Sequence, residues 1–185
     1  MRILAISGSL RADSYNTALA RAAAELAPRG VDVELYEGLA QIPLYDADWD
    51  GEDTPAAVRD LRERIAAADA LLVVTPEYNG SVSGVLKNAI DWASRPADPD
   101  SVLWGKTAAV AGATTGQYGA IWAQQDLRRI LGIAGARVID GEVPVARAQN
   151  VFDSSGRLLD PLVAARLRDH LVALVHDAAP VLVAA

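Results

Sequence analysis

The chain has 185 residues, of which 51% are hydrophobic and 22% are charged, a composition that suits one globular domain and excludes intrinsic disorder. With 17 Lys and Arg against 24 Asp and Glu, the net charge of -7 opposes binding to nucleic acid or to an anionic membrane surface. The chain has no Cys and 2 His, which excludes a disulfide framework, a cysteine nucleophile and a His-rich metal site.

The first residues, MRILAIS, form an apolar stretch that is too short for a signal peptide. Nowhere does an apolar segment of about 20 residues run without charges, Gly or Pro, so we expect no transmembrane helix. We therefore expect a cytoplasmic protein.

Short apolar segments alternate with longer segments of helical periodicity along the chain. The predicted strands are Arg2–Ser7, Val31–Tyr36, Ala70–Thr75, Lys106–Ala111 and Arg137–Ile139. The predicted helices are Asn16–Pro28, 55–68, Val82–Ser94, Ala120–Leu131 and Asp160–Ala178. The acidic segment Gln41–Thr54 is interpreted as a loop.

This alternation predicts an α/β fold in which helices cover both faces of a parallel sheet. Five strands with five helices suit a doubly wound, flavodoxin-like sheet of order 2-1-3-4-5, in a single domain that spans residues 1–185. Ligands bind such sheets outside the carboxyl ends of the strands. The candidate binding loops are therefore residues 7–17, 75–83 and 112–119.

The first candidate loop places hydroxyl, amide and guanidinium groups directly before a helix. The residues concerned are Ser9, Arg11, Ser14, Asn16 and Thr17. The unpaired N–H groups of a helix N-terminus attract anions, and these side chains add further donors. The pattern favours a phosphate monoester bound without a metal, while Ser14 or Asn16 is also expected to cap the helix.

The second candidate loop combines an Asn-Gly pair with two residues that can form a wall. Asn79-Gly80 allows unusual φ angles, Pro76 and Tyr78 supply the wall, and residues 77–81 supply main-chain amides. A flat heteroaromatic ring with an N–C=O edge suits this turn. An ordinary strand-to-helix turn is the alternative.

Two segments resemble the NADPH-dependent FMN reductase family, which includes quinone, azo-dye and chromate reductases. They are GSLRADSYNTALA (Gly8–Ala20) and PEYNGSVSGVLKNAIDWASRP (Pro76–Pro96), and the resemblance extends to about residue 135. It implies that the first loop holds the phosphate of FMN and that Pro76, Glu77, Tyr78, Asn79, Gly80 and Ser81 hold the ring. It also places a third loop at the far edge of the ring, with Gly112, Thr114, Thr115 and Gly116 where relatives usually have Ser followed by Gly-Gly.

The resemblance implies an oxidoreductase in which NADPH, or NADH, gives a hydride to FMN. A small acceptor (a flavin, a quinone, an azo compound or a metal oxyanion) then takes the place of the nicotinamide. FMN carries the chemistry, so we predict no catalytic side chain and no metal. A flavodoxin-type electron carrier and a non-catalytic flavin-binding module remain alternatives, and the flavin could also be a diffusing substrate.

An open sheet leaves a bound flavin exposed, and family members complete the site with a second subunit. We therefore expect a homodimer or a homotetramer. Outside the three loops, Trp92 is interpreted as a core residue and His170 and His176 as surface residues. Trp122 could line a substrate mouth, but burial in the core is the preferred interpretation. Gln124 belongs to a charged helix face that is either solvated or at an interface.

Overall fold

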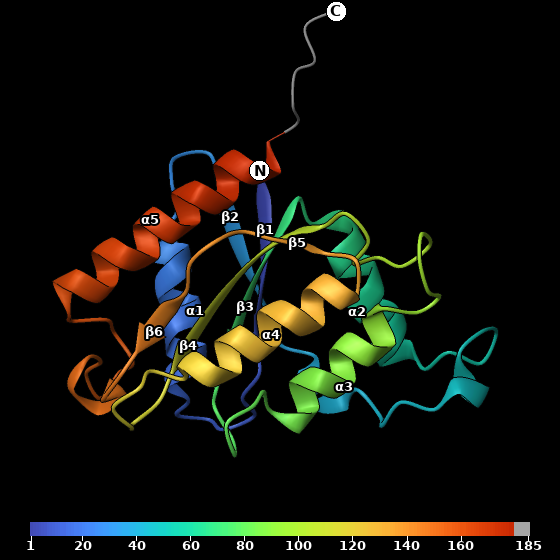
Figure 1. Ribbon diagram of the computed structural model, residues 1–185, viewed down its shortest axis with the longest axis horizontal. Helices are drawn as coiled ribbons and strands as arrows, with labels where there is room; N and C mark the ends of the chain where they lie inside the picture. Colours follow the sequence, from blue (N-terminus) through green and yellow to red (C-terminus); the bar gives the residue numbers. More distant parts are fainter. Residues whose placement is uncertain (180–185) are drawn as a thin grey trace, which may run out of the picture.

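A twisted parallel sheet runs through the middle of the molecule, between two layers of helices (Figure 1). The computed structural model describes residues 1–179. Its strands are β1 (Arg2–Ser7), β2 (Asp32–Tyr36), β3 (Ala70–Thr75), β4 (Thr107–Ala113), β5 (Arg137–Val138) and β6 (Val143–Val145). The order is β2-β1-β3-β4-β5, as predicted, and β6 also pairs with β4.

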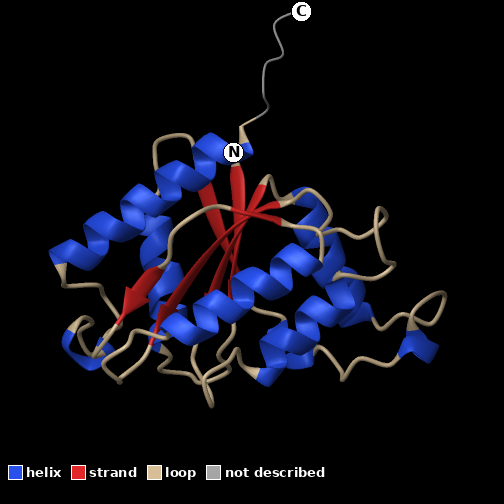
Figure 2. Cartoon of the chain, viewed as in Figure 1, coloured by secondary structure: helices blue, strands red, loops and turns tan. Residues whose placement is uncertain are grey.

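The helices cover the two faces of the sheet in unequal numbers (Figure 2). They are α1 (Tyr15–Leu26), α2 (Ala56–Ala67), α3 (Gly84–Ala93), α4 (Ile121–Ile133) and α5 (Pro161–Ala178). Residues of α1 and α5 form one apolar core with the sheet, and residues of α2, α3 and α4 form the other. No helix in the described part of the chain is both long and apolar enough to cross a membrane.

The central strand β3 shows why this sequence folds with two cores. All six of its residues are buried. Successive side chains of a strand point to opposite faces, so Leu72 and Val74 pack toward α1 and α5, whereas Leu71 and Val73 pack toward α2, α3 and α4. Burial of each Leu or Val side chain contributes about 1.5–3 kcal/mol.

The fifth strand departs from the prediction, because it is interrupted. The first part, β5, pairs with the start of β4, and the second part, β6, pairs with Ala111, Gly112 and Ala113 at its end. Between them Gly141 has a φ of 87°, a left-handed conformation that ends the regular pairing. The interruption places β6 beside the carboxyl end of β4, where the candidate loops begin.

Three expectations about single residues were wrong. His170 is buried, with Nε2 3.1 Å from the carbonyl oxygen of Val110, and burial lowers the pKa of its imidazole. Gln124 is buried, and its amide joins the carbonyl oxygen of Gly119 to the N–H of Val143. Trp122 is half-exposed. Trp92, by contrast, is fully buried as expected, and His176 is exposed.

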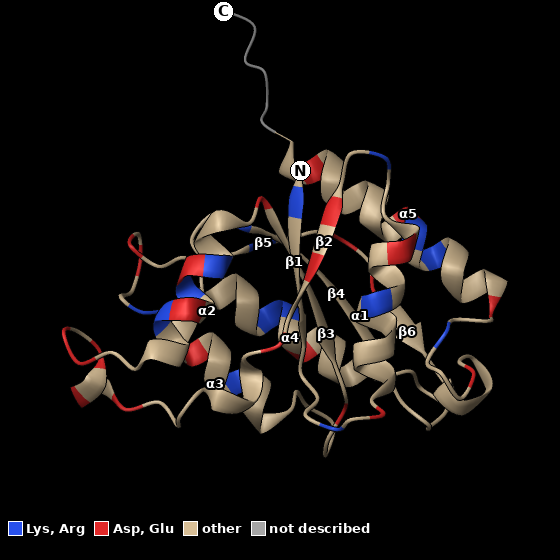
Figure 3. Cartoon of the chain, turned by 180° about the vertical axis from the view of Figure 1, so that it is seen from behind, with Lys and Arg blue, Asp and Glu red and all other residues tan. Residues whose placement is uncertain are grey.

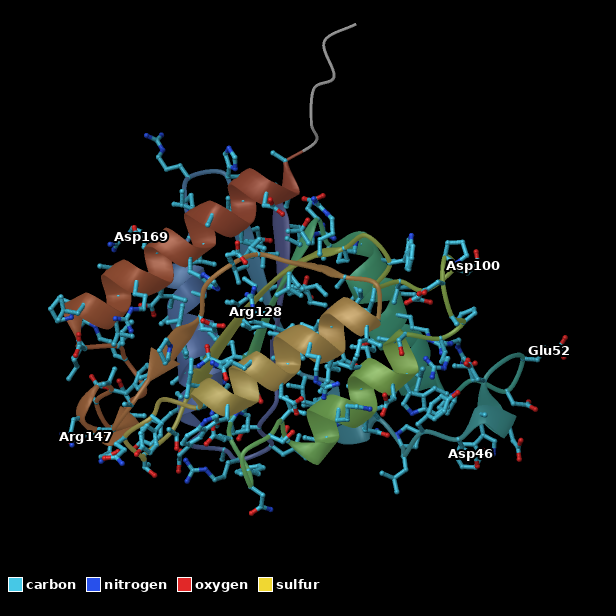
Figure 4. The ribbon with its side chains drawn as sticks, viewed as in Figure 1. Asp46, Glu52, Asp100, Arg128, Arg147 and Asp169 are labelled. Carbon is cyan, nitrogen blue, oxygen red and sulfur yellow. The ribbon has the colours of Figure 1, made fainter. Side chains whose placement is uncertain are left out.

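Charged residues are mixed in sign over the helices and outer loops, and the view from behind shows no single basic patch (Figure 3). The acidic segment projects beyond α2 and α3, with Asp46 and Glu52 at its outer part (Figure 4). It is attached to the body by an ion pair of 2.8 Å between Asp50 and Arg62.

Candidate functional site

The three candidate loops leave the sheet at one edge, because β1, β3 and β4 are parallel and in register. The first two loops are joined directly. The N–H of Gly8 donates to the carbonyl oxygen of Val74 at 2.8 Å, and the hydroxyl of Ser83 donates to the carbonyl oxygen of Gly8 at 2.6 Å. A Cβ on Gly8 would lie 2.9 Å from a methyl carbon of Leu86 and 3.0 Å from the Ser83 hydroxyl oxygen, so a larger residue would force both side chains to shift.

Three residues of the first loop have structural partners. The Ser14 hydroxyl oxygen caps α1 by accepting hydrogen bonds from the N–H groups of Asn16 and Thr17, at 3.2 and 3.4 Å. The Asn16 amide is buried and makes two hydrogen bonds with the main chain of Ala113, at 2.8 and 3.0 Å. Thr17 lies with its hydroxyl oxygen 2.9 Å from that of Ser7. Asn16 therefore joins the first loop to the third.

The remaining polar groups of the first loop are open. Within the described chain, the main-chain N–H groups of residues 9–14 and the Ser9 hydroxyl have no hydrogen-bond partner. The exposed Arg11 guanidinium donates to the carbonyl oxygen of Asp13 at 2.7 Å and keeps its other donors free. A run of free donors before a helix is the donor set that a phosphate group requires.

The second loop is a closed turn. Tyr78 and Ser81 exchange two main-chain hydrogen bonds of 3.0 and 3.1 Å. Between them Asn79 and Gly80 have φ angles of 53° and 76°, as in a type I′ turn. The N–H groups of Asn79 and Gly80 have no partner among the described residues. The turn therefore presents two free main-chain donors on a fixed backbone.

Side chains of the second loop connect it to α4. The Glu77 carboxylate accepts hydrogen bonds from the N–H groups of Trp122 and Ala123, at 3.1 and 3.2 Å, and so caps a helix whose own preceding residue provides no side-chain cap. The Ser81 hydroxyl donates to the Asp126 carboxylate. That bond and one from Arg129 lower the pKa of Asp126. Pro76 is buried at the start of the loop.

The third loop divides into a packed part and an open part. A Cβ on Gly112 would lie 2.8 Å from the carbonyl oxygen of Thr75, so this glycine is required by packing. Thr114 bonds to β6 through its N–H, which lies 3.0 Å from the carbonyl oxygen of Val145. Thr115 and Gly116 are exposed at the edge. The predicted contacts of this loop therefore fall on residues 114–116.

Sequence reasoning missed the segment that closes this side of the site. The N–H of Arg147 donates to the carbonyl oxygen of Gly116 at 2.8 Å, and Arg147 has a left-handed φ of 47°. Its exposed side chain lies at the same edge as the loops (Figure 4). The sequence signal for this contact is the broken fifth strand, because residues 146–148 follow β6 directly. No group of three or more His, Asp or Glu suited to a metal ion occurs among residues 1–179.

The fold and the site define a flavodoxin-like protein. A donor-rich loop, a rigid main-chain turn and an open third loop lie at the carboxyl ends of the strands of a doubly wound sheet. Comparison with known proteins gives the family. The model of the NADPH-dependent FMN reductase family matches residues 1–150, and the chain belongs to that family.

Individual relatives agree with this assignment. An NAD(P)H-dependent FMN reductase of Pseudomonas aeruginosa is 47% identical over 175 residues, which cover 94% of this chain and 93% of that protein. A 2-hydroxy-1,4-benzoquinone reductase of a Burkholderia species is 39% identical over 160 residues, 86% of each chain. The structure of FerB, a flavoenzyme NAD(P)H:(acceptor) oxidoreductase of Paracoccus denitrificans, matches with a TM-score of 0.83 and 34% identity over 96% of both chains.

These findings confirm the resemblance, the flavodoxin-like fold and the class of enzyme predicted from the sequence. The protein is an oxidoreductase that works with FMN and NAD(P)H. The free donors of residues 9–14 and of the Tyr78–Ser81 turn fit a phosphate and a polar ring edge, respectively.

Proposed function

We propose that the three loops hold FMN between them, with the phosphate on the first loop and the ring between the second and the third. The main support for this proposal is the set of free N–H groups of residues 9–14, because these donors have no acceptor within the described chain and are available to a ligand. Ser9, Arg11 and Thr17 add side-chain donors. Ser14 keeps its hydroxyl proton for the phosphate while its oxygen caps α1, and Asn16 holds the loop in position.

When bound, FMN would supply the hydride-transfer chemistry between the nicotinamide and an acceptor. The chain would bind and orient it. The free N–H groups of Asn79 and Gly80 would donate to the polar edge of the ring and stabilise negative charge there. Thr114, Thr115 and Gly116 would line the far edge. No side chain of these loops has to act as an acid or a base.

The acceptor that we propose is a small molecule, a free flavin or a quinone. The names of the relatives, an FMN reductase and a benzoquinone reductase, support both. Azo compounds and metal oxyanions remain candidates from the sequence. The charge of the chain and the FMN chemistry both suit reduction of small metabolites in the cytoplasm.

The protein also has a surface suited to a second copy of itself, as a homodimer or as part of a homotetramer. A groove of about 530 Å³ lies between α3 and α4. Lys87 pairs with Asp91 on α3, and Asp126 pairs with Arg129 on α4, so each side of the groove carries both charges. A two-fold related copy can pair with such a self-complementary surface. Ile133, 72% exposed at the groove, adds an apolar contact.

The experiment that tests the function is the absorption spectrum of the purified protein with FMN, before and after NADPH. We expect tight binding of FMN, little affinity for riboflavin, and bleaching of the flavin by NADPH followed by recovery when a quinone is added. Bound FMN without NADPH oxidation would indicate an electron carrier or a flavin-binding module. Equal affinity for FMN and riboflavin would contradict the phosphate site. Light scattering tests the oligomer, and Ile133→Asp is expected to shift it toward monomer.

A further inference from the structure

Two large aromatic side chains lie in contact with each other beside the proposed flavin site, and neither has been assigned a contact with the flavin. The rings of Tyr118 and Trp122 lie with their centroids 4.8 Å apart and their planes tilted by 56°. Both are accessible, with 54% of Tyr118 and 47% of Trp122 exposed. Aromatic rings of this size are normally buried, because each removes a large apolar area from water. A paired and accessible set of ring faces is therefore a surface for another flat, apolar group.

The fold fixes this pair next to the turn proposed for the flavin ring. The N–H of Trp122 donates to the Glu77 carboxylate at 3.1 Å, so the residue that precedes Tyr78 holds the first turn of α4. Tyr118 is fixed through Gly119, which has a φ of 63° and packs so closely on Pro144 that a Cβ would lie 2.8 Å away. The aromatic pair is thus held from the second loop and from β6 at once.

The carboxylates beside the aromatic pair already have partners within the chain. The Glu77 carboxylate accepts from the N–H of Trp122, and Asp126, one helical turn later, accepts from the Ser81 hydroxyl. The guanidinium of Arg129 is paired with Asp126. The aromatic pair therefore offers flat apolar faces beside charges that are already paired, an environment that attracts a planar ring by stacking.

We propose that Tyr118 and Trp122 form the platform on which a neutral, planar aromatic acceptor stacks, and that this platform makes a quinone-type acceptor preferred over one that has no flat ring to stack. The proposal rests on the proposed function and assigns its acceptor subsite to residues of this chain. Tyr118 and Trp122 position the acceptor by stacking, and neither takes part in proton or electron transfer.

The test compares the FMN-loaded wild type with Trp122→Leu and Tyr118→Leu. We expect each variant to raise KM for 1,4-naphthoquinone about three- to tenfold, because an aromatic contact contributes about 0.5–1.5 kcal/mol beyond its area. The kcat, and the rates with the anionic acceptor ferricyanide, should stay unchanged. Trp122→Phe, which keeps a smaller ring, should retain most of the affinity. The matched control is Trp104→Leu, because Trp104 is 51% exposed and precedes β4 at the opposite edge of the sheet.

Saturation-transfer NMR with quinoline, a planar ring that the enzyme need not reduce, measures the platform without turnover. Transfer to quinoline should fall in Trp122→Leu and persist in Trp104→Leu. If the wild type fails to oxidise NADPH, the proposed function is contradicted. The quinoline measurement does not depend on turnover, so it still tests whether Tyr118 and Trp122 bind a planar ring. An unchanged quinone KM, an equal loss with ferricyanide, a loss of FMN, or a change of oligomeric mass in both variants would overturn the inference.

Discussion

The loop after β1 and the turn after β3 are neighbours, yet their backbones are organised in opposite ways. Residues 9–14 leave their N–H groups without partners, whereas Tyr78–Ser81 closes on itself through two hydrogen bonds and two left-handed residues. The first loop offers many hydrogen-bond donors, so loss of one donor should lower the affinity for FMN only in part. The second loop offers a backbone of fixed conformation, so one residue that cannot adopt the turn should abolish FMN binding.

The largest effect is expected at Gly80, where φ is 76°. Gly80→Val should abolish FMN binding and leave the fold intact, because a β-branched residue strongly disfavours this conformation. A Cβ there would meet no atom within 4 Å, so the effect would come from the backbone alone. FMN titration and circular dichroism measure both outcomes. Gly84→Val is the matched control, since it has open space and no left-handed φ. A Gly80→Val protein that is folded, yellow and active would require another ring site.

The next effect is expected at Arg11. Arg11→Ala removes a charge-assisted hydrogen bond of about 1.5–3 kcal/mol, so FMN should bind about ten- to a hundredfold more weakly. Riboflavin affinity and the urea midpoint should not change. Arg21→Ala, on the exposed side of α1, is the control. If both arginine variants weaken FMN equally, the effect is general charge and not a phosphate contact.

A smaller effect is expected at Asn79, the other left-handed residue of the turn, with φ of 53°. Asn79→Ala should weaken FMN about tenfold, because Ala in this conformation costs about 1–2 kcal/mol that Asn largely avoids. Asn79→Gly should restore wild-type affinity in the same fluorescence titration. Failure of glycine to restore binding would mean that the Asn79 side chain itself contacts the ligand.

The smallest effect on FMN is expected at Glu77, although the sequence placed it among the ring-binding residues. Glu77→Ala removes the cap of α4 and should lower the free energy of unfolding by about 0.5–2 kcal/mol in urea denaturation. FMN affinity should change by less than about threefold. Glu77→Gln, which can still accept a hydrogen bond, is the control. A larger loss of FMN than of stability would return Glu77 to the flavin site.

The strands β1, β3 and β4 were predictable because each is a short apolar run, and β2 because apolar and polar residues alternate along it. β1 and β3 have the predicted bounds, and the order of the sheet follows from the alternation with helices. The interruption between β5 and β6 was not predicted, since it depends on how residues 139–142 leave the edge of β4. His170 lies on the buried face of α5 with Leu167 and Leu171, and its acceptor, Val110, is 60 residues away in the chain.

The candidate site, like the fold, was predictable only where the signal is local. Its residue types and loops were visible in the sequence, because strand ends, Asn-Gly and hydroxyl clusters are local signals. The partners of its side chains were not. The Asn16 amide bonds to Ala113, 97 residues away, and Glu77 caps a helix that begins more than 40 residues later. Burial was the preferred interpretation of Trp122 over a place at a substrate mouth, but its turn of α4 extends to the edge of the sheet and leaves the side chain half-exposed.

The two side-chain hydrogen bonds from the second loop to α4 provide a physical connection between flavin binding and the association of two copies of the chain. Glu77 and Ser81 connect the turn to the helix that lines the groove between α3 and α4. If flavin binding tightens the turn and thereby strengthens association of two copies, association must strengthen flavin binding by the same factor. Retention of the yellow colour should then depend on protein concentration: dilution that separates the copies should release flavin more readily than simple mass action on a single chain allows.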